Sequence, residues 1–189
     1  MIKDSKSAES LAKILSEALP YIQKFSGKIV VIKYGGSAMK ENKLRQNFAR
    51  DIALMRQIGI FPVLVHGGGP QIERNLKKNN IKSVFIDGLR KTDENSIKTI
   101  VKTLREVNGD IAELIKTWGA RTKTFNDVRE SILICKKIKT KMDLGFVGDI
   151  TKVDGNLIRK NIFNGKIPVI APIGRDRFCL LYTSPSPRD

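Results

Sequence analysis

The sequence predicts an α/β protein, a three-layer sandwich around a mainly parallel central sheet. Two short apolar runs, 29–32 and 61–65, each lead into a glycine cluster, and apolar residues at helical spacing follow each cluster. This repeated order of strand, glycine turn and helix is typical of α/β sheets. Their ligand sites lie at the carboxyl ends of the parallel strands.

An amphipathic helix is expected ahead of the first strand, in residues 1–26. Ser5 or Ser7 is available as its N-cap, and Pro20 should stop or kink it. Its apolar stripe continues toward Gly27 and consists of Leu11, Ile14, Leu15, Ala18, Leu19, Tyr21, Ile22 and Phe25. Because a helix outside the core must bury its apolar face, we expect 1–26 to mediate oligomerisation. Packing back on its own domain is the alternative.

The first half of the domain follows the repeated pattern. The run 29–32 indicates a parallel strand covered on both faces, and it ends at Lys33 and the turn 35–36. A helix closed by Gly59 follows, and a second buried strand then ends in the cluster 66–69, from which another helix starts. The inward-facing positions are Leu44, Phe48, Ile52, Met55 and Ile58 in the first helix, and Ile72 and Leu76 in the second.

The second half begins with a hairpin at 83–90 that carries Arg90. Thr92 or Asp93 can cap a long apolar helix that reaches Trp118. Further strands are expected at 132–134, 145–153 and 167–170, with a turn at Asp154-Gly155.

One domain, residues 27–177, accounts for this pattern. Residues 178–189 differ from it, because they contain no lysine in a lysine-rich chain and include two Ser-Pro pairs that suit neither helix nor strand. We expect 178–189 to be non-native sequence, from a truncated reading frame running into a vector or adapter scar. A native disordered tail is the alternative.

The charge of the chain is strongly positive, with 35 Lys and Arg against 19 Asp and Glu and a net charge of +16. The basic residues are scattered and accompany no nucleic-acid-binding motif, so we expect anionic small molecules as partners and no nucleic acid. Cys135 and Cys179 fit no metal-ligand spacing and indicate free thiols in a reducing compartment. With no export signal and no membrane-spanning apolar stretch, a cytoplasmic protein is predicted.

The glycine clusters are the clearest chemical signal. Glycine lets backbone N–H groups approach an anion, and a helix that starts there adds its positive N-terminal end. Tight turns also use glycine for steric reasons, so each cluster alone is weak; with Lys33 and Arg90 they predict an anion site. Neither cluster matches G-x-x-x-x-G-K-[ST] or G-x-G-x-x-G, and no metal site is predicted.

The segments Val31–Ser37, Val65–Ile72 and Asp87–Asp93 together resemble the N-acetylglutamate kinases of the amino acid kinase family. Residues 145–154 also resemble the family's hairpin segment. The resemblance implies ATP-dependent phosphorylation of the side-chain carboxylate of N-acetyl-L-glutamate to N-acetyl-L-glutamyl 5-phosphate in arginine biosynthesis. Leu19–Ile22 resembles the N-terminal helix of arginine-inhibited members, which implies a homo-oligomer when full length and feedback inhibition by arginine.

The resemblance also implies roles for individual residues. Lys33 would stabilise charge on the transferring phosphoryl group. Gly35 and Gly36 would donate N–H groups to the phosphates of ATP, whose Mg²⁺ is held mainly by those phosphates. Gly68 and Gly69 would donate to the acceptor.

The resemblance also bears on the side chains of Arg90 and His66. Arg90 would grip the acceptor's α-carboxylate, which its planar fork suits better than lysine could. His66 is the one histidine. We do not expect it to act as a base, because a carboxylate acceptor is already ionised at pH 7. His66 is expected to shape the turn.

Several departures bear on this resemblance. The chain stops at about Asp176, before the family's Asn-rich motif, catalytic aspartate, second lysine and adenine-binding half, so the fragment should be inactive alone. Residues 123–130 lack the glycine-rich stretch expected there, and Lys91 stands where many members carry Val.

The alternatives are an acetylaminoadipate kinase, an aspartokinase, the kinase-like domain of an N-acetylglutamate synthase, and a basic nucleic-acid-binding module. The triple-glycine turn and the Gly-Leu-Arg segment favour acetylglutamate over the other two kinase substrates. Lys33 and the triple glycine count against the synthase domain, where they are commonly missing.

Overall fold

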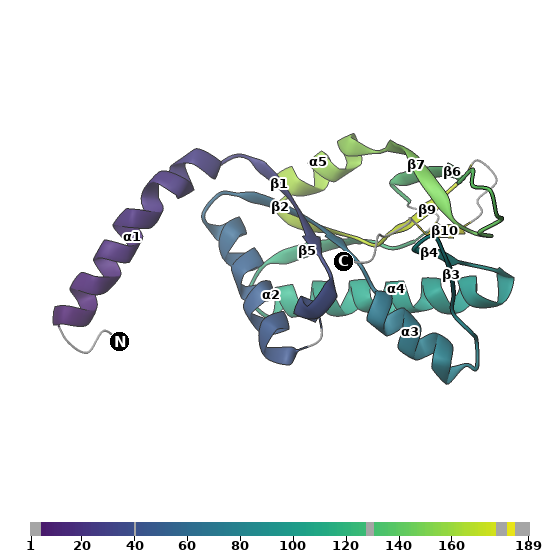
Figure 1. Cartoon of the computed structure of the whole chain (residues 1–189). Coiled ribbons are helices and arrows are strands. Elements are labelled where there is room, and N and C mark those ends of the chain that lie inside the picture. Colours follow the sequence, from purple (N-terminus) through teal and green to yellow (C-terminus); the bar gives the residue numbers. More distant parts are fainter. Residues whose placement is uncertain (1–4, 40, 128–130, 177–180, 184–189) are drawn as a thin grey trace.

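The computed structural model describes residues 5–39, 41–127, 131–176 and 181–183, and it has three layers with a helix projecting from one end (Figure 1). The elements in chain order are α1 (Ser5–Phe25), β1 (Ile29–Tyr34), the 3₁₀ helix η1 (Gly36–Met39), α2 (Asn42–Gln57), β2 (Phe61–His66), α3 (Gly69–Lys78), β3 (Val84–Ile86), β4 (Leu89–Lys91), α4 (Glu94–Lys116), β5 (Arg121–Phe125), β6 (Leu133–Lys137), β7 (Gly148–Val153), α5 (Gly155–Phe163), β8 (Lys166–Ile170), β9 (Ile173–Arg175) and β10 (Leu181–Thr183).

The central sheet is parallel throughout, with the strand order β1-β2-β8-β5. Tyr34 pairs with His66 at the carboxyl ends of β1 and β2. A second sheet has the order β10-β9-β6-β7, and β3 and β4 form a separate hairpin. The predicted α/β class with a mainly parallel central sheet is therefore confirmed.

Helices cover the central sheet on both faces. On one face, α2 and α4 pack against β1, β2 and β8 in a core that includes Ile52, Leu64, Ile111, Ile115, Ile167 and Val169. On the other face, α5 packs against β2, β5 and β8 around Val63, Phe125, Ile162 and Ile170. Burial of these apolar groups, at roughly 25 cal/mol per Å², holds the three layers together.

The first strand departs from the prediction, because β1 is not covered on both faces in this chain. Ile29 is 42% exposed and Val31 67%, while Tyr34 on the other face is buried at 4%. The apolar side chains of β1 favour burial, but β1 lies at the edge of the sheet. Helix α5 packs over the neighbouring strands instead. The prediction of double coverage was wrong for this strand.

The predicted turns and caps of the hairpin and long helix are confirmed. Asp87 and Gly88 both have positive φ, 49° and 78°, as a two-residue hairpin turn requires. The side chain of Asp93 accepts a hydrogen bond of 2.8 Å from the backbone N–H of Ser96 and caps α4. This cap fixes where α4 starts, directly after the strand that carries Arg90.

Three local features differ from the sequence analysis or extend it. Helix α1 continues through Pro20 to Phe25, since the missing N–H removes one helical hydrogen bond without ending the helix. Asp154 was expected in a turn but is the N-cap of α5, a helix that was not predicted. Its side chain accepts a hydrogen bond from the N–H of Leu157 at 2.9 Å.

Part of the atypical segment 123–130 lies in β5, and 128–130 fall outside the described residues.

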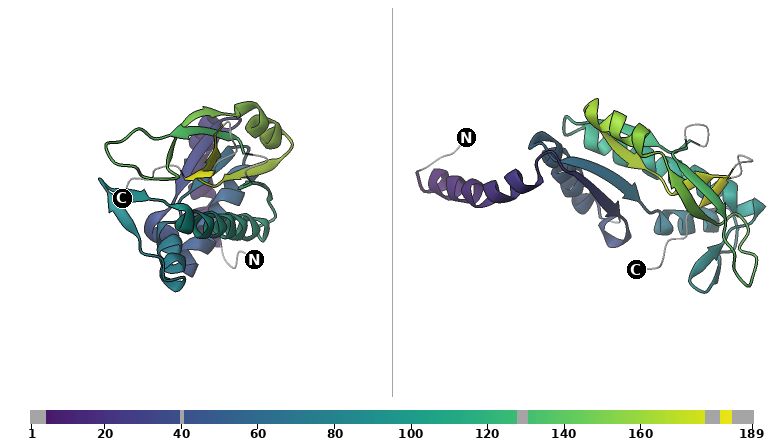
Figure 2. Two further views of the ribbon diagram at one scale, coloured as in Figure 1. Left: turned by 90° about the vertical axis from the view of Figure 1, so that its right-hand side faces the viewer. Right: turned by 90° about the horizontal axis from the view of Figure 1, so that it is seen from above.

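Helix α1 extends away from the three layers (Figure 2), and its apolar side chains are exposed. The exposed fractions are 44% for Leu11, 58% for Ile14 and Leu15, 50% for Leu19 and 68% for Tyr21. The stripe therefore does not pack back on its own domain, and its role in oligomerisation stays a prediction. Among the described helices, none has both the length and the apolar character needed to cross a membrane.

The expected non-native segment 178–189 lies mostly outside the described residues. Its residues Leu181–Thr183 form β10, which pairs antiparallel with β9. The origin of the segment stays a prediction.

Candidate active site

The two glycine turns lie side by side at one edge of the central sheet. The N–H of Gly67 donates to the carbonyl of Tyr34 at 2.8 Å, which continues the β1–β2 ladder into the turns. A Cβ atom on Gly67 would lie 4.0 Å from the Cα of Gly35. Parallel pairing of β1 and β2 causes this proximity, because both strands end at the same edge.

The second turn presents backbone donors at the start of a helix. Helix α3 begins at Gly69, and its first helical hydrogen bond runs from the N–H of Ile72 to the carbonyl of Gly68 at 2.8 Å. Among the described residues, the N–H groups of Gly68 and Gly69 have no backbone acceptor. Two unpaired donors at a helix N-terminus form a favourable place for a carboxylate or phosphate.

The glycines differ in the space around them. A Cβ at Gly68 would lie 2.8 Å from Cδ2 of Leu104, whereas Gly69 and Gly35 have no atoms beyond their own neighbouring backbone and adjacent residues within 4 Å of a Cβ position. Gly36 has a φ of 62°, which favours glycine. Gly68 and Gly36 are thus required by the turn itself, and Gly69 and Gly35 keep open space in front of it.

Lys33 is exposed and lies on the open face of β1, the face it shares with Ile29 and Val31. Its register partner on β2 is Val65, one residue before the end of that strand. The backbone of Lys33 is thus two residues from the Gly35 turn, and its side chain lies on the α5 side of the sheet.

Arg90 contacts helix α3 from the β3–β4 hairpin. Its guanidinium donates to Oε2 of Glu73 on α3 at 3.0 Å and to Oγ of Ser83, and it stacks 4.5 Å from the ring centre of Phe85. The Arg90 side chain is only 16% exposed. Glu73 lies four residues after Gly69, so the ion pair ties Arg90 to the helix that starts at the turn.

Aromatic stacking braces the first glycine turn, a feature that the sequence analysis missed. The rings of Tyr34 and Phe48 lie 3.9 Å apart and almost parallel, and the Tyr34 hydroxyl donates to the carbonyl of Ala38 at 3.1 Å. Burial raises the pKa of Tyr34 above its usual value of 10.0, so the phenol keeps its proton. These contacts fix the chain on both sides of Gly35 and Gly36.

His66 is buried behind the second turn and paired with Asn108 of α4, which the sequence analysis did not identify. Nε2 of His66 is 3.0 Å from Nδ2 of Asn108, and Nδ1 of His66 is 2.6 Å from the carbonyl oxygen of Gly67. Burial lowers the pKa of His66 below 6.5, which favours the neutral imidazole. These contacts give His66 the turn-shaping place expected from the sequence.

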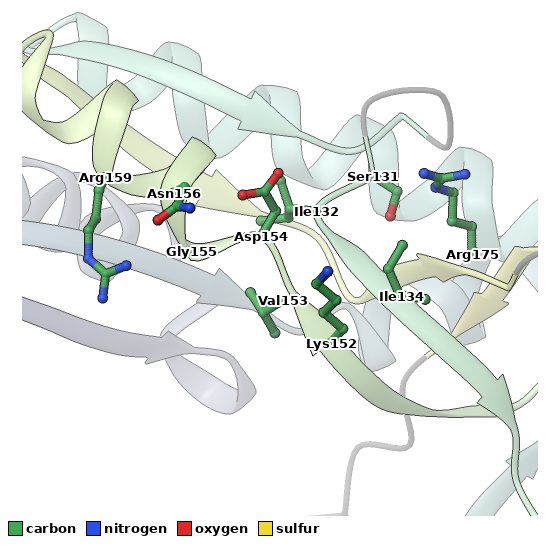
Figure 3. Close-up of a pocket in the computed structure, with 10 residues that line it drawn as sticks. All are labelled: Ser131, Ile132, Ile134, Lys152, Val153, Asp154, Gly155, Asn156, Arg159 and Arg175. Carbon is green, nitrogen blue, oxygen red and sulfur yellow. The ribbon is translucent and has the colours of Figure 1, made fainter.

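A cavity of about 770 Å³ lies elsewhere, between β6, β7 and the start of α5 (Figure 3). Its lining includes Lys152, Arg159 and Arg175, and Nε of Arg175 is buried without a hydrogen-bond partner among the described residues. In Figure 3, Arg159 and Arg175 lie at opposite ends, and the three cationic groups share no common centre. The cavity includes none of the residues predicted for the site.

The described residues contain no group of three or more His, Cys, Asp or Glu side chains that could hold a metal ion. Cys135 is buried and free, as expected, and burial raises the pKa of its thiol to about 11. It is therefore protonated at neutral pH and a poor nucleophile. Cys179 lies outside the described residues.

The chain is similar in sequence to known proteins over most of its length. A profile of the amino acid kinase family matches residues 28–183. The chain is 46% identical over 164 residues to an acetylglutamate kinase of Clostridium kluyveri, covering 86% of this chain and 58% of that protein. It is 44% identical over 186 residues to one of Stutzerimonas stutzeri, covering 92% and 62%. The chain thus spans less than two thirds of the length of these curated relatives.

Solved structures show the same fold. An N-acetylglutamate synthase from Neisseria gonorrhoeae, complexed with coenzyme A and N-acetyl-glutamate, superposes with a TM-score of 0.78 at 24% identity, covering 90% of this chain and 39% of that chain. An isopentenyl phosphate kinase superposes with a TM-score of 0.52 at 16% identity, covering 83% and 63%.

Proposed function

The chain belongs to the amino acid kinase family, and from this we propose that it is the acceptor-binding part of an N-acetylglutamate kinase. The reaction would transfer the γ-phosphoryl group of ATP to the side-chain carboxylate of N-acetyl-L-glutamate. The main structural support is the hydrogen bond from Gly67 to Tyr34, which brings the two glycine turns together at one edge of the sheet. Two adjacent anion sites are what a transfer between two anionic substrates needs.

Each turn would hold one substrate. Gly35 and Gly36 would donate to the ATP phosphates, and Gly68 and Gly69 to the acceptor. Lys33 would stabilise the charge on the phosphoryl group in transit, which is the larger part of catalysis in such reactions. The nucleophile is an ionised carboxylate at pH 7, so the proposal needs no general base, and it leaves His66 neutral and structural.

Arg90 would bind the α-carboxylate of N-acetyl-L-glutamate. A guanidinium has five N–H donors. Ser83 and Glu73 take one each, so donors remain for a ligand. Glu73 and Phe85 restrain the side chain in advance, which lowers the entropy lost when a carboxylate binds.

The residues assigned to the site offer N–H groups, an ammonium and a guanidinium, and none is a carboxylate. Such donors suit phosphate oxygens and not a cation, so Mg²⁺ would be carried mainly by the ATP phosphates and would neutralise part of their charge. The proposal also includes a cytoplasmic location, a homo-oligomer of the longer protein and inhibition of that protein by arginine.

The test is an ATP-dependent hydroxamate assay on the longer natural protein that contains residues 27–176. N-acetyl-L-glutamate, N-acetyl-L-2-aminoadipate and L-aspartate would be compared as acceptors, with Lys33→Ala as the control. We expect the highest kcat/KM with N-acetyl-L-glutamate. Preference for either other acceptor would contradict the substrate assignment and leave the family assignment intact.

The fold likeness to a synthase makes a non-catalytic kinase-like domain the second candidate. The presence of Lys33 and of three consecutive glycines at the turn favours the kinase, because a cation and two glycine turns suit transfer between two anionic substrates. Acetyl transfer from acetyl-CoA to glutamate by the longer protein, without ATP-dependent hydroxamate formation, would support the synthase instead.

A further inference from the structure

We propose that Asn108 positions the acceptor turn through the imidazole of His66. Asn108 donates to Nε2 of His66 and holds the ring with its protonated Nδ1 toward Gly67, and His66 then fixes the carbonyl of Gly67 and the N–H of Gly68. The identity of the ligand at the turn rests on the function proposed above. The positioning itself rests on contacts within the chain.

The pair is buried where packing alone would not call for polar groups. Asn108 is 0% exposed and His66 is 2% exposed. The residues of α4 around Asn108 that are also buried are apolar: Leu104, Val107, Ile111 and Ala112. Oδ1 of Asn108 is buried without a hydrogen-bond partner among the described residues, an unfavourable state that an apolar residue would avoid. Asn108 is therefore poorly explained as a packing residue.

The direction of the hydrogen bonds follows from one fixed acceptor. Nδ2 of Asn108 lies 3.0 Å from the carbonyl oxygen of Val169 on β8, and a carbonyl can only accept. The amide nitrogen must therefore face Val169, because the reverse orientation would set two oxygens against each other. The same nitrogen lies 3.0 Å from Nε2 of His66, so Nε2 is the acceptor.

A neutral imidazole that accepts at Nε2 must carry its proton on Nδ1. Nδ1 of His66 lies 2.6 Å from the carbonyl oxygen of Gly67, and its proton completes that hydrogen bond. Burial favours the neutral ring, since it lowers the pKa of His66. The chain of donors therefore runs from Asn108 through His66 to Gly67.

Fixing the Gly67 carbonyl also fixes a donor of the turn. The peptide between Gly67 and Gly68 is planar and trans, so its carbonyl and its N–H point in opposite directions. With the carbonyl held toward His66, the N–H of Gly68 points away from the ring. That N–H has no backbone acceptor among the described residues and is a donor assigned to the acceptor substrate.

Helix α4 supports the turn at a second point. Leu104 lies four residues before Asn108, on the same face of α4, and its Cδ2 lies 2.8 Å from where a Cβ of Gly68 would be. Leu104 packs behind Gly68 while Asn108 holds Gly67 through His66. The same helix thus sets both the position and the orientation of the peptide that presents the donor.

The wild-type chain alone provides the first test. It has one histidine, so ¹⁵N NMR of the imidazole at pH 7 reports His66 without overlap. We expect a protonated Nδ1 and an unprotonated Nε2. A protonated Nε2, with Nδ1 bare or also protonated, would overturn the proposal whatever the protein binds.

The second test compares Asn108→Leu with Asn161→Leu. Asn161 is also buried, and its Nδ2 donates to the carbonyl of Leu157 within α5. Its replacement by leucine therefore removes a comparable buried amide at a position away from the turn. In Asn108→Leu we expect the ¹⁵N resonance of His66 Nε2 to shift, because Nε2 loses its hydrogen-bond donor, and we expect the Gly68 amide resonance to shift as well. Asn161→Leu should leave both unchanged. Unchanged signals in a folded Asn108→Leu variant would refute the positioning role.

Titration of N-acetyl-L-glutamate into the chain, followed at the Gly68 and Gly69 amides, adds the functional readout. We expect Asn108→Leu to bind about tenfold more weakly than wild type and Asn161→Leu equally well, because one directed hydrogen bond is lost. Equal affinity in Asn108→Leu would overturn the role in binding. If no variant binds but the tautomer and the Gly68 shift behave as expected, the positioning holds and the substrate assignment fails.

Discussion

Replacing Gly69 by alanine adds a methyl group in front of the proposed acceptor turn without disturbing the fold. Apart from its two neighbours in the chain and the nearby backbone of α3, no atom lies within 4 Å of the added Cβ, and the backbone there does not have positive φ. Alanine at the first position of α3 should change stability by less than about 1 kcal/mol, because the lost freedom of the unfolded chain opposes the cost of helical backbone for a residue with a Cβ before Pro70. Any loss of binding would then come from the ligand and not from folding.

The expected loss of binding can be estimated from the donors. The methyl group would keep a carboxylate from the N–H groups of Gly68 and Gly69, and a hydrogen bond to a charged group contributes about 1.5–3 kcal/mol. Affinity for N-acetyl-L-glutamate should therefore fall by roughly 10- to 150-fold. Calorimetric titration gives the affinity, and urea unfolding gives the stability.

Two other glycines serve as controls. Gly68→Ala would push against Cδ2 of Leu104 and should destabilise the chain by about 1–3 kcal/mol. Gly109, inside α4 with open space around it, should gain about 1 kcal/mol as alanine and leave binding unchanged. Affinity within twofold of wild type in Gly69→Ala would refute the assignment of the turn. A loss of stability well above about 1 kcal/mol in Gly69→Ala would refute the reasoning from the open space.

Four further outcomes are expected. In the longer protein, Arg90→Ala should mainly raise the KM for N-acetyl-L-glutamate and Lys33→Ala should mainly lower kcat; an unchanged KM in the Arg90 variant would contradict its assignment. The pKa of His66 is lower in the folded state, so the unfolded state takes up a proton on His66 first as the pH falls below 6.5. The free energy of unfolding should therefore decrease below pH 6.5, by at most about 1.4 kcal/mol per pH unit. In His66→Gln this pH dependence should flatten. Removing residues 1–26 should reduce the oligomer mass of the longer protein in light scattering, and an unchanged mass would exclude α1 from the interface. The 189-residue chain should form no hydroxamate above its Lys33→Ala control, and measurable turnover would show that the groups in this chain suffice.

Local signals were enough to predict most of the elements near the site. The runs 29–32 and 61–65 have the composition of buried parallel strands, and Asp93 is a strong helix cap, so the strands and α4 could be placed from neighbouring residues alone. Helix α5 was missed because it has only nine residues and starts at an Asp-Gly pair that also reads as a turn. A short helix depends on packing against the sheet more than on its own sequence.

The pairing of side chains across the fold could not be predicted in the same way. Two strands that end in glycine were enough to predict neighbouring turns, because parallel strands share an edge. The contacts of Arg90 with Glu73 and of His66 with Asn108 join residues 17 and 42 positions apart. Nothing in the local pattern selects one polar residue on α3 or α4 over another, since the partner is chosen by how the helix packs on the sheet.

The open face of β1 connects the fold to the proposed chemistry. Val31, 67% exposed, and the exposed Lys33 share this face, although one residue prefers burial and the other prefers water. In water, a lysine interacts with a phosphoryl group several-fold more weakly than it would at a covered site, because the effective dielectric constant falls from about 80 to about 20 or below. A segment of the longer protein that covered Val31 would also remove water from around Lys33. The same burial would therefore stabilise the sheet edge and strengthen the cation, which is a physical reason to predict that the proposed acceptor-binding part is inactive alone.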